Sequence, residues 1–123
     1  RDRSPSRGLG DVYKRQNMHS TMNLGGCVVS KNILEKRGRL KWCFREESVN
    51  NIDNGWRFLS EIDTDEFLAD SKNMVICDWG TIFEIEPAIA LIFELPIGTE
   101  LTLEYDGSQK CFVDSETGEK LIF

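Results

Sequence analysis

Histidine is almost absent from this sequence, because His19 is the only one in 123 residues. Nucleophilic catalysis by serine or cysteine ordinarily needs a neighbouring base, which is most often histidine. Phosphate-binding glycine loops are missing as well, since Gly25-Gly26 lacks the spacing of a G-x-x-x-x-G-K motif. We therefore expect no catalytic residue, no cofactor and no enzymatic activity.

The cysteines do not have the spacing of metal ligands. Cys27, Cys43, Cys77 and Cys111 lie far apart in the sequence and form no Cys-x-x-Cys pair. Each lies in an apolar or alternating run, which favours a reduced thiol in a buried strand over a zinc ligand. We expect no bound metal ion.

Long apolar runs are also absent. No stretch approaches the roughly 20 apolar residues of a membrane-spanning helix, and the basic N-terminus has no apolar segment of a signal peptide. We expect a cytoplasmic protein without membrane contact. Hydrophobic residues still make up 40% of the chain and include 7 Phe and 3 Trp, which is enough for the core of one domain.

The N-terminal residues do not resemble the rest of the chain. Residues 1–17 are rich in Arg, Ser and Gly, show no periodicity and precede two candidate start residues, Met18 and Met22. The string SPSRGLGDVYKRQ resembles a translated sequencing adaptor. We expect residues 1–17 to be a non-native or disordered tail and residues 18–123 to form a single domain.

Positive charge is scarce in the second part of the chain. Residues 46–123 hold four basic and eighteen acidic side chains, whereas residues 17–45 hold six basic and one acidic. An acidic surface repels nucleic acid and attracts a basic protein, whose encounter it accelerates. We expect a protein partner, such as a basic nuclease domain, and no nucleic acid. A simpler reading, in which the acidity only keeps the protein soluble, stays open.

Several short elements can be predicted from the first part of the sequence. We expect a strand over residues 27–29 and a helix over residues 30–37 that Ser30 caps. Residues 40–45 alternate as a strand that places Leu40, Trp42 and Phe44 on one face. A turn at Asn54-Gly55 leads into a pairing strand over residues 56–59.

The second part of the sequence adds helices and a hairpin. Asp63 and Glu66 match a capping box for a helix over residues 64–69, and residues 74–77 read as a central strand. Two short helices follow, separated by Pro87, and then a hairpin that turns at Asp106-Gly107 and a last strand over residues 120–123. We predict a single small α+β domain with a mixed or antiparallel sheet, three to four short helices and a C-terminal β-hairpin.

One region combines residue types that dominate binding surfaces. Two neighbouring strands bring together tryptophans, arginines and acids, and an acidic segment follows them. In a second reading these residues are structural: Trp42 and Phe44 face the core, and the arginines pair with acids to fix the turn. The candidate partner-binding residues are Arg45, Glu46, Glu47, Asp53, Trp56, Arg57, Asp63, Asp65 and Glu66.

The motifs Arg45-Glu46-Glu47 and Gly55-Trp56-Arg57-Phe58, with Val75-Ile76-Cys77-Asp78, resemble the bacterial immunity protein 33 family, formerly domain of unknown function 2185. The resemblance runs from about Gly25 to Gly98, so we expect the C-terminal hairpin to be particular to this protein. It implies a small α+β protein that neutralises a cognate polymorphic toxin by direct binding inside the producing cell.

Two other functions stay open. The chain could bind a small molecule in a pocket walled by Trp42, Trp56 and Trp79. It could also be a hydrolase, which would need two carboxylates close together in a cleft, one with a perturbed pKa. The oligomeric state is not predicted.

Overall fold

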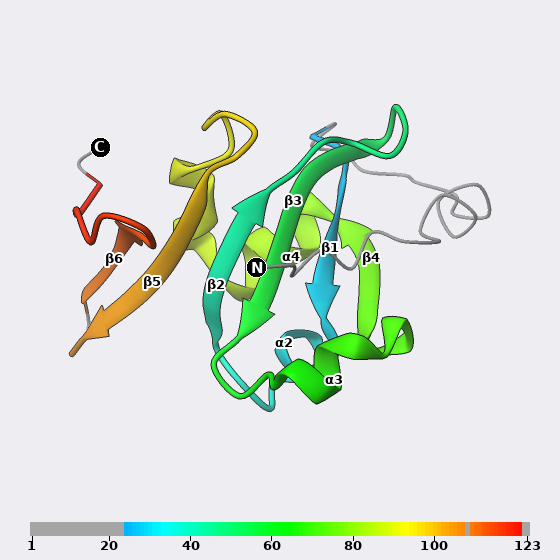
Figure 1. Ribbon diagram of the computed structural model, residues 1–123, viewed down its shortest axis with the longest axis horizontal. Helices are drawn as coiled ribbons and strands as arrows, with labels where there is room; N and C mark the ends of the chain where they lie inside the picture. Colours follow the sequence, from blue (N-terminus) through cyan, green and yellow to red (C-terminus); the bar gives the residue numbers. More distant parts are fainter. Residues whose placement is uncertain (1–23, 108, 122–123) are drawn as a thin grey trace.

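The computed structural model describes residues 24–107 and 109–121. The predicted tail, both candidate start residues and the end of the predicted last strand lie outside these residues. Figure 1 shows the elements in chain order. They are β1 (Gly26–Ser30), α2 (Lys31–Leu34), β2 (Leu40–Arg45), β3 (Asp53–Ser60), α3 (Asp65–Ala69), η1 (Ser71–Asn73), β4 (Met74–Asp78), α4 (Trp79–Ile85), η2 (Pro87–Leu91), β5 (Glu100–Asp106) and β6 (Gln109–Asp114).

The strands form one mixed sheet in the order β4-β1-β3-β2-β5-β6. β1 and β3 run parallel, and each of the other neighbouring pairs is antiparallel. β5 and β6 form the predicted C-terminal hairpin, and Lys120 makes an isolated antiparallel bridge to Val113. The predicted α+β class, with a mixed sheet and short helices, is confirmed. No helix in the described part of the chain is long and apolar enough to cross a membrane.

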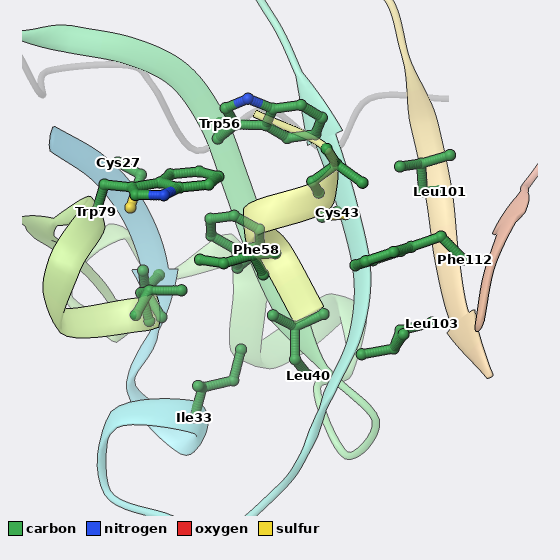
Figure 2. Packing of buried hydrophobic residues seen from close by; sticks show 14 residues of the cluster. Cys27, Ile33, Leu40, Cys43, Trp56, Phe58, Trp79, Leu101, Leu103 and Phe112 are labelled. Carbon is green, nitrogen blue, oxygen red and sulfur yellow. The ribbon is translucent and has the colours of Figure 1, made fainter. Parts of the chain in front are cut away.

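One face of the sheet carries the main hydrophobic core (Figure 2). α4 and η2 cover this face and contribute Trp79, Ile82 and Ile89 to it. From β3 come Trp56 and Phe58, whose stacked rings have centroids 6.1 Å apart. Because all five side chains are at most 1% exposed, each buried Ile or Phe stabilises the fold by about 1.5–3 kcal/mol.

The opposite face carries a smaller cluster, because alternate residues of a strand point to opposite faces of the sheet. Val28 of β1, Leu59 of β3 and Ile76 of β4 belong to it, and Leu68 of α3 packs against them. β1 is therefore buried on both faces, as is common for a strand in a parallel pair.

The aromatic residues of β2 do not lie where the alternation placed them. Leu40 and Cys43 belong to the main core, whereas Trp42 and Phe44 pack against the smaller cluster on the other face. The pairing of β2 with β3 shifts register between Leu40 and Trp42, and such a bulge turns the following residues over. The prediction that Leu40, Trp42 and Phe44 share one face is wrong.

Asn54-Gly55 is part of a strand and not a turn. Both residues lie inside β3, and residues 46–52 make the connection from β2. Gly55 has a φ of 89°, and a Cβ there would lie 2.3 Å from the Glu46 carbonyl oxygen. The motif thus permits a close approach of two strands, whose predicted antiparallel pairing is confirmed.

β4 lies at the edge of the sheet, although its continuous apolar run predicted a central strand. The run is apolar because Met74 and Ile76 join the smaller cluster while Cys77 packs against the main core. Packing on both faces is therefore compatible with an edge position. A continuous apolar run therefore indicates that both faces of a strand are buried, but it does not indicate whether the strand has one or two neighbours in the sheet.

The helices begin nearly where the caps predicted; α3 also ends at the predicted residue, Ala69, whereas α2 ends earlier. Ser30 caps α2 by accepting a hydrogen bond from the Asn32 N–H at 3.1 Å, but α2 ends at Leu34. Thr64 caps α3 through the Phe67 N–H at 3.0 Å, so the predicted capping role of Asp63 is wrong. The segment after Glu86 is a 3₁₀ helix that begins at Pro87.

Candidate partner-binding surface

The candidate residues lie at two opposite ends of the sheet. β3 separates Asp53 from Ser60 by about 23 Å, at about 3.3 Å per residue. We define the loop end as residues 46–52 and 92–99. The backbone N–H of Arg45, which directly precedes the first segment, donates to the carbonyl of Thr99 in the second at 3.0 Å. We define the helix end as residues 61–70, which include α3. In Figure 1 the β2–β3 connection and α3 lie at opposite ends of β3.

Arg57 is a fully buried cation at the centre of the loop end. Its two Nη atoms each donate to one oxygen of Asp53 at 2.8 Å, and its Nε donates to Glu46 at 2.6 Å. Burial alone would lower the pKa of Arg57 and raise that of Asp53. Their mutual hydrogen bonds and charges outweigh it, so the pKa of Arg57 is raised and that of Asp53 lowered.

Asp53 also fixes the backbone of the β2–β3 connection. Its carboxylate accepts hydrogen bonds from the N–H groups of Val49 and Gly55, both at 2.9 Å. Asn50 Oδ1 in the same connection accepts from the Ile52 N–H at 2.9 Å. The connection is thereby held in one conformation by side-chain acceptors that sit beneath it.

Arg45 joins the two segments of the loop end. Its Nε donates to the Asn54 carbonyl at 3.0 Å, and its Nη1 donates to the Leu95 carbonyl at 2.7 Å and the Phe93 carbonyl at 3.3 Å. The indole N–H of Trp56 donates to the same Phe93 carbonyl at 3.1 Å. Both side chains therefore hold residues 92–99 against the β2–β3 connection.

A carboxylate plays the corresponding role at the helix end. Asp63 accepts from the Ser60 N–H and hydroxyl at 2.8 and 2.6 Å, from the Ser30 hydroxyl at 2.9 Å and from the Asn32 side chain at 2.7 Å. These bonds tie the end of β3 to the start of α2. Asp65 and Glu66, by contrast, are exposed in the first turn of α3.

Five candidate residues thus hold the structure and four reach the surface. Arg45, Asp53, Trp56, Arg57 and Asp63 satisfy internal hydrogen bonds, and Trp56 and Arg57 are completely buried. Glu47, Asp65 and Glu66 are exposed, and the Glu46 side chain is 22% exposed. A role of any of them in partner binding stays a prediction. The structural reading of Arg57, which pairs it with Asp53 and Glu46, is confirmed.

Sequence reasoning missed the acceptors and donors that complete both ends. Ser30, Asn32 and Ser60 complete the Asp63 site, yet each looks like an ordinary cap or strand-end residue. It also missed Val49 and Ile97, which are 39% and 57% exposed. Both could have been found in the sequence, because each is an isolated apolar residue in a loop of polar or turn-forming residues.

Residues 27–113 match the family model of the immunity protein Imm33 domain. The chain belongs to this family. Neither a search of curated proteins nor one of solved structures gave a significant match. The Imm33 match runs from β1 into β6, so the C-terminal hairpin belongs to the family domain, and the expectation that it is particular to this protein is wrong.

The Imm33 domain also has a cleft of about 580 Å³, near the helix end. The α2–β2 turn, the end of α4 and Tyr105 of β5 line it. Arg39 lies over the Tyr105 ring at 4.0 Å, and Ile33 and Leu40 are buried beneath. Tyr105 donates to the Leu40 carbonyl at 2.7 Å, and burial raises its pKa to about 12.

The tryptophans do not wall a shared pocket in this Imm33 domain. Trp56 and Trp79 are buried in the main core with ring centroids 6.4 Å apart, whereas Trp42 lies on the other face of the sheet. No tryptophan lines the cleft described above. The predicted pocket of Trp42, Trp56 and Trp79 is therefore wrong.

The carboxylates that line the cleft are engaged in ion pairs or point to solvent. Arg39 lowers the pKa of Glu61, which is the opposite of the shift that a general acid needs. Glu86 is buried and pairs with Lys110 at 2.9 Å, and Glu84 is exposed. Among residues 24–107 and 109–121 no group of His, Cys, Asp and Glu side chains is placed to hold a metal ion.

Proposed function

We propose that this Imm33 domain protects its producer by binding a cognate toxin directly, without catalysis. The observation that carries the proposal is the arrangement of the two ends of the sheet. At each end an ionic side chain, Arg57 or Asp63, is hydrogen-bonded internally and holds the local backbone, and exposed carboxylates lie nearby in the chain. A preorganised surface loses little conformational entropy when it binds a partner.

The candidate residues divide between two roles in this proposal. Either Glu46 and Glu47 at the loop end or Asp65 and Glu66 at the helix end supply the carboxylates that contact the toxin, since solvent reaches all four side chains. The candidate residues that hold the two ends in place without touching the partner are Arg45, Asp53, Trp56, Arg57 and Asp63.

The partner is a basic protein domain, and a nuclease fits this description. Nucleases bind phosphates, so their active surfaces carry Lys and Arg side chains. The eighteen acidic residues of the second part of the chain complement such a surface and accelerate association. The encounter takes place in the cytoplasm, before the toxin leaves the cell that makes it.

Co-expression with a candidate toxin domain, sought first among the genes beside this one, tests the proposal. We expect the full chain to protect cells, and the two purified proteins to form a stoichiometric complex in calorimetry. We expect the association rate to fall at least about tenfold between 20 and 300 mM salt, because surface charges are screened. Protection without any detectable complex would contradict direct binding.

A second candidate function is the binding of a small molecule in the cleft. The volume of about 580 Å³ lies within the range of ligand sites, and the Arg39–Tyr105 stack supplies a flat polar surface. Thermal-shift measurements against a panel of metabolites test it, with Tyr105→Ala as the variant that should lose any response. Since no tryptophan lines the cleft, intrinsic tryptophan fluorescence is not a suitable probe.

A further inference from the structure

Exposed apolar side chains gather near the loop end. Of the four large hydrophobic residues exposed in the described part of the chain, Val49, Leu91 and Ile97 lie in or next to the loop end. The fourth, Ile62, lies at the helix end and is 48% exposed. Apolar side chains that solvent reaches, within a polar rim, are typical of protein-binding surfaces.

The backbone under these apolar residues is held firmly. Gly98, next to Ile97, donates to the Arg45 carbonyl at 2.7 Å, and Val49 donates its N–H to Asp53 at 2.9 Å. Both apolar residues are therefore attached to the network of Arg45, Asp53 and Arg57. Side chains on such supports bind without first ordering a loop.

The charge around these residues is negative and uncompensated. Glu47 and Glu94 are exposed, and within residues 24–107 and 109–121 neither has an ion-pair partner. The two cations of this region, Arg45 and Arg57, are already bound to carbonyls and carboxylates. The loop end itself, residues 46–52 and 92–99, contains no Lys or Arg that could attract an acidic partner.

The helix end has a different charge pattern. Asp63 is engaged internally, and Glu61 pairs with Arg39 at 3.2 Å. Lys36 and Arg37 line the cleft beside them. Asp65, Glu66 and Asp70 are nevertheless exposed there, so charge alone would suit a basic partner at either end, and the exposed apolar residues are what favours the loop end.

We propose that the loop end is the surface that docks the toxin, with Val49 and Ile97 as its apolar centre and Glu47 and Glu94 as its acidic rim. This inference rests on the proposed function. The partner surface that fits it carries an apolar or aromatic contact surrounded by Lys and Arg side chains. The candidate acids of α3, Asp65 and Glu66, lie outside the contact.

Matched variants at the two ends test this assignment. Calorimetry with the purified toxin domain from the same locus, inactivated by mutation, gives the Kd of the full chain and of each variant. We expect Ile97→Asp and Glu47→Lys each to weaken binding about tenfold or more. We expect Ile62→Asp and Glu66→Lys, which change equally exposed residues at the helix end, to alter the Kd less than about threefold.

Thermal melts of the free variants serve as the folding control, since all four positions are exposed and the melting temperature should hardly move. The reverse pattern, or equal losses at both ends, overturns the loop-end assignment while direct binding stands. If the unmodified chain does not bind the toxin domain, the proposed function itself falls.

Discussion

The two ends of the sheet are held by opposite charges. At the loop end the central group is a cation, Arg57, which donates to two carboxylates. At the helix end it is an anion, Asp63, which accepts from hydroxyl, amide and backbone donors. A charged residue in a motif typical of binding surfaces can therefore serve to hold the structure together.

These two charged residues also differ in what their loss would leave behind. Removing Arg57 leaves two carboxylates without their cation, and the side chain of one of them, Asp53, is fully buried. Removing Asp63 leaves only neutral donors, those of Ser30, Asn32 and Ser60, without this acceptor. A buried charge without a partner is the more expensive of the two. We therefore expect the loop end to be the more sensitive to substitution.

The largest effect is expected for Arg57→Ala. The buried carboxylate of Asp53 loses its bidentate partner, so the free energy of unfolding should fall by about 3–5 kcal/mol. Urea denaturation at pH 7 measures it, with Arg57→Lys as the control that keeps the charge but not the forked geometry. An unchanged midpoint for Arg57→Ala would show that this network does not hold the loop end.

A smaller loss is expected for Asp63→Ala at the helix end. Four hydrogen bonds to one carboxylate disappear, and we expect a cost of about 2–3 kcal/mol in the same denaturation experiment. Asp63→Asn keeps one acceptor oxygen, so its free energy of unfolding should lie between that of the unmodified chain and that of Asp63→Ala. If Asp63→Ala costs more than Arg57→Ala, the ranking of the two ends is reversed.

The stability that Asp53 provides at the loop end should also depend on pH. The pKa of Asp53 is lower in the folded than in the unfolded chain, so its contribution to stability is complete above the unfolded pKa of about 3.9. This contribution is lost as the pH falls through the lowered folded pKa. Asp53→Asn lacks that dependence, and its unfolding free energy should fall less steeply than that of the unmodified chain between about pH 5 and 2. Parallel pH profiles for the two proteins would contradict the assignment.

The smallest loss of stability is expected for substitution of Arg45, which connects the two segments of the loop end. Arg45→Met keeps the aliphatic stem but frees the carbonyls of Leu95 and Phe93, and we expect a cost of about 1–2 kcal/mol. Hydrogen exchange should speed up at Gly98 and Leu95 and not at Asp63. Uniform acceleration at both ends would mean that Arg45 acts on global stability alone.

The alternation and capping patterns in the sequence were sufficient for most elements but not for the site. Residues 40–45 form a strand as predicted. A bulge after Leu40, which the sequence pattern does not indicate, places Trp42 and Phe44 on the face of the sheet opposite to Leu40. Asn54-Gly55 has the composition of a turn, and only the contact with Glu46 shows why glycine is needed within β3. Long-range contacts of this kind cannot be read from local residue types.

The candidate residues illustrate the same limit. Arg and Trp dominate binding surfaces, and this makes Arg45, Trp56 and Arg57 candidates. The same residue types also hold structures together from within, so residue type alone does not separate the two roles. Their internal roles depend on distant segments, such as the Phe93 carbonyl that accepts a hydrogen bond from the Trp56 indole. Asp63 stands beside Asp65 and Glu66 in the chain, and only the fold separates the internal carboxylate from the exposed ones.

The position of β1 determines when this domain can fold during synthesis. β1 is the first described strand, but it lies between β3 and β4 in the sheet. Cys27 of β1 lies opposite Cys77 of β4 in the strand register, 50 residues later in the chain. Such non-local pairing slows folding and delays closure of the sheet until the partner strand exists. At about 5–20 residues per second, a ribosome needs roughly 3–10 s to extend the chain from β1 to β4. In each new copy the pairing of β1 with β4 therefore begins only after a delay of seconds.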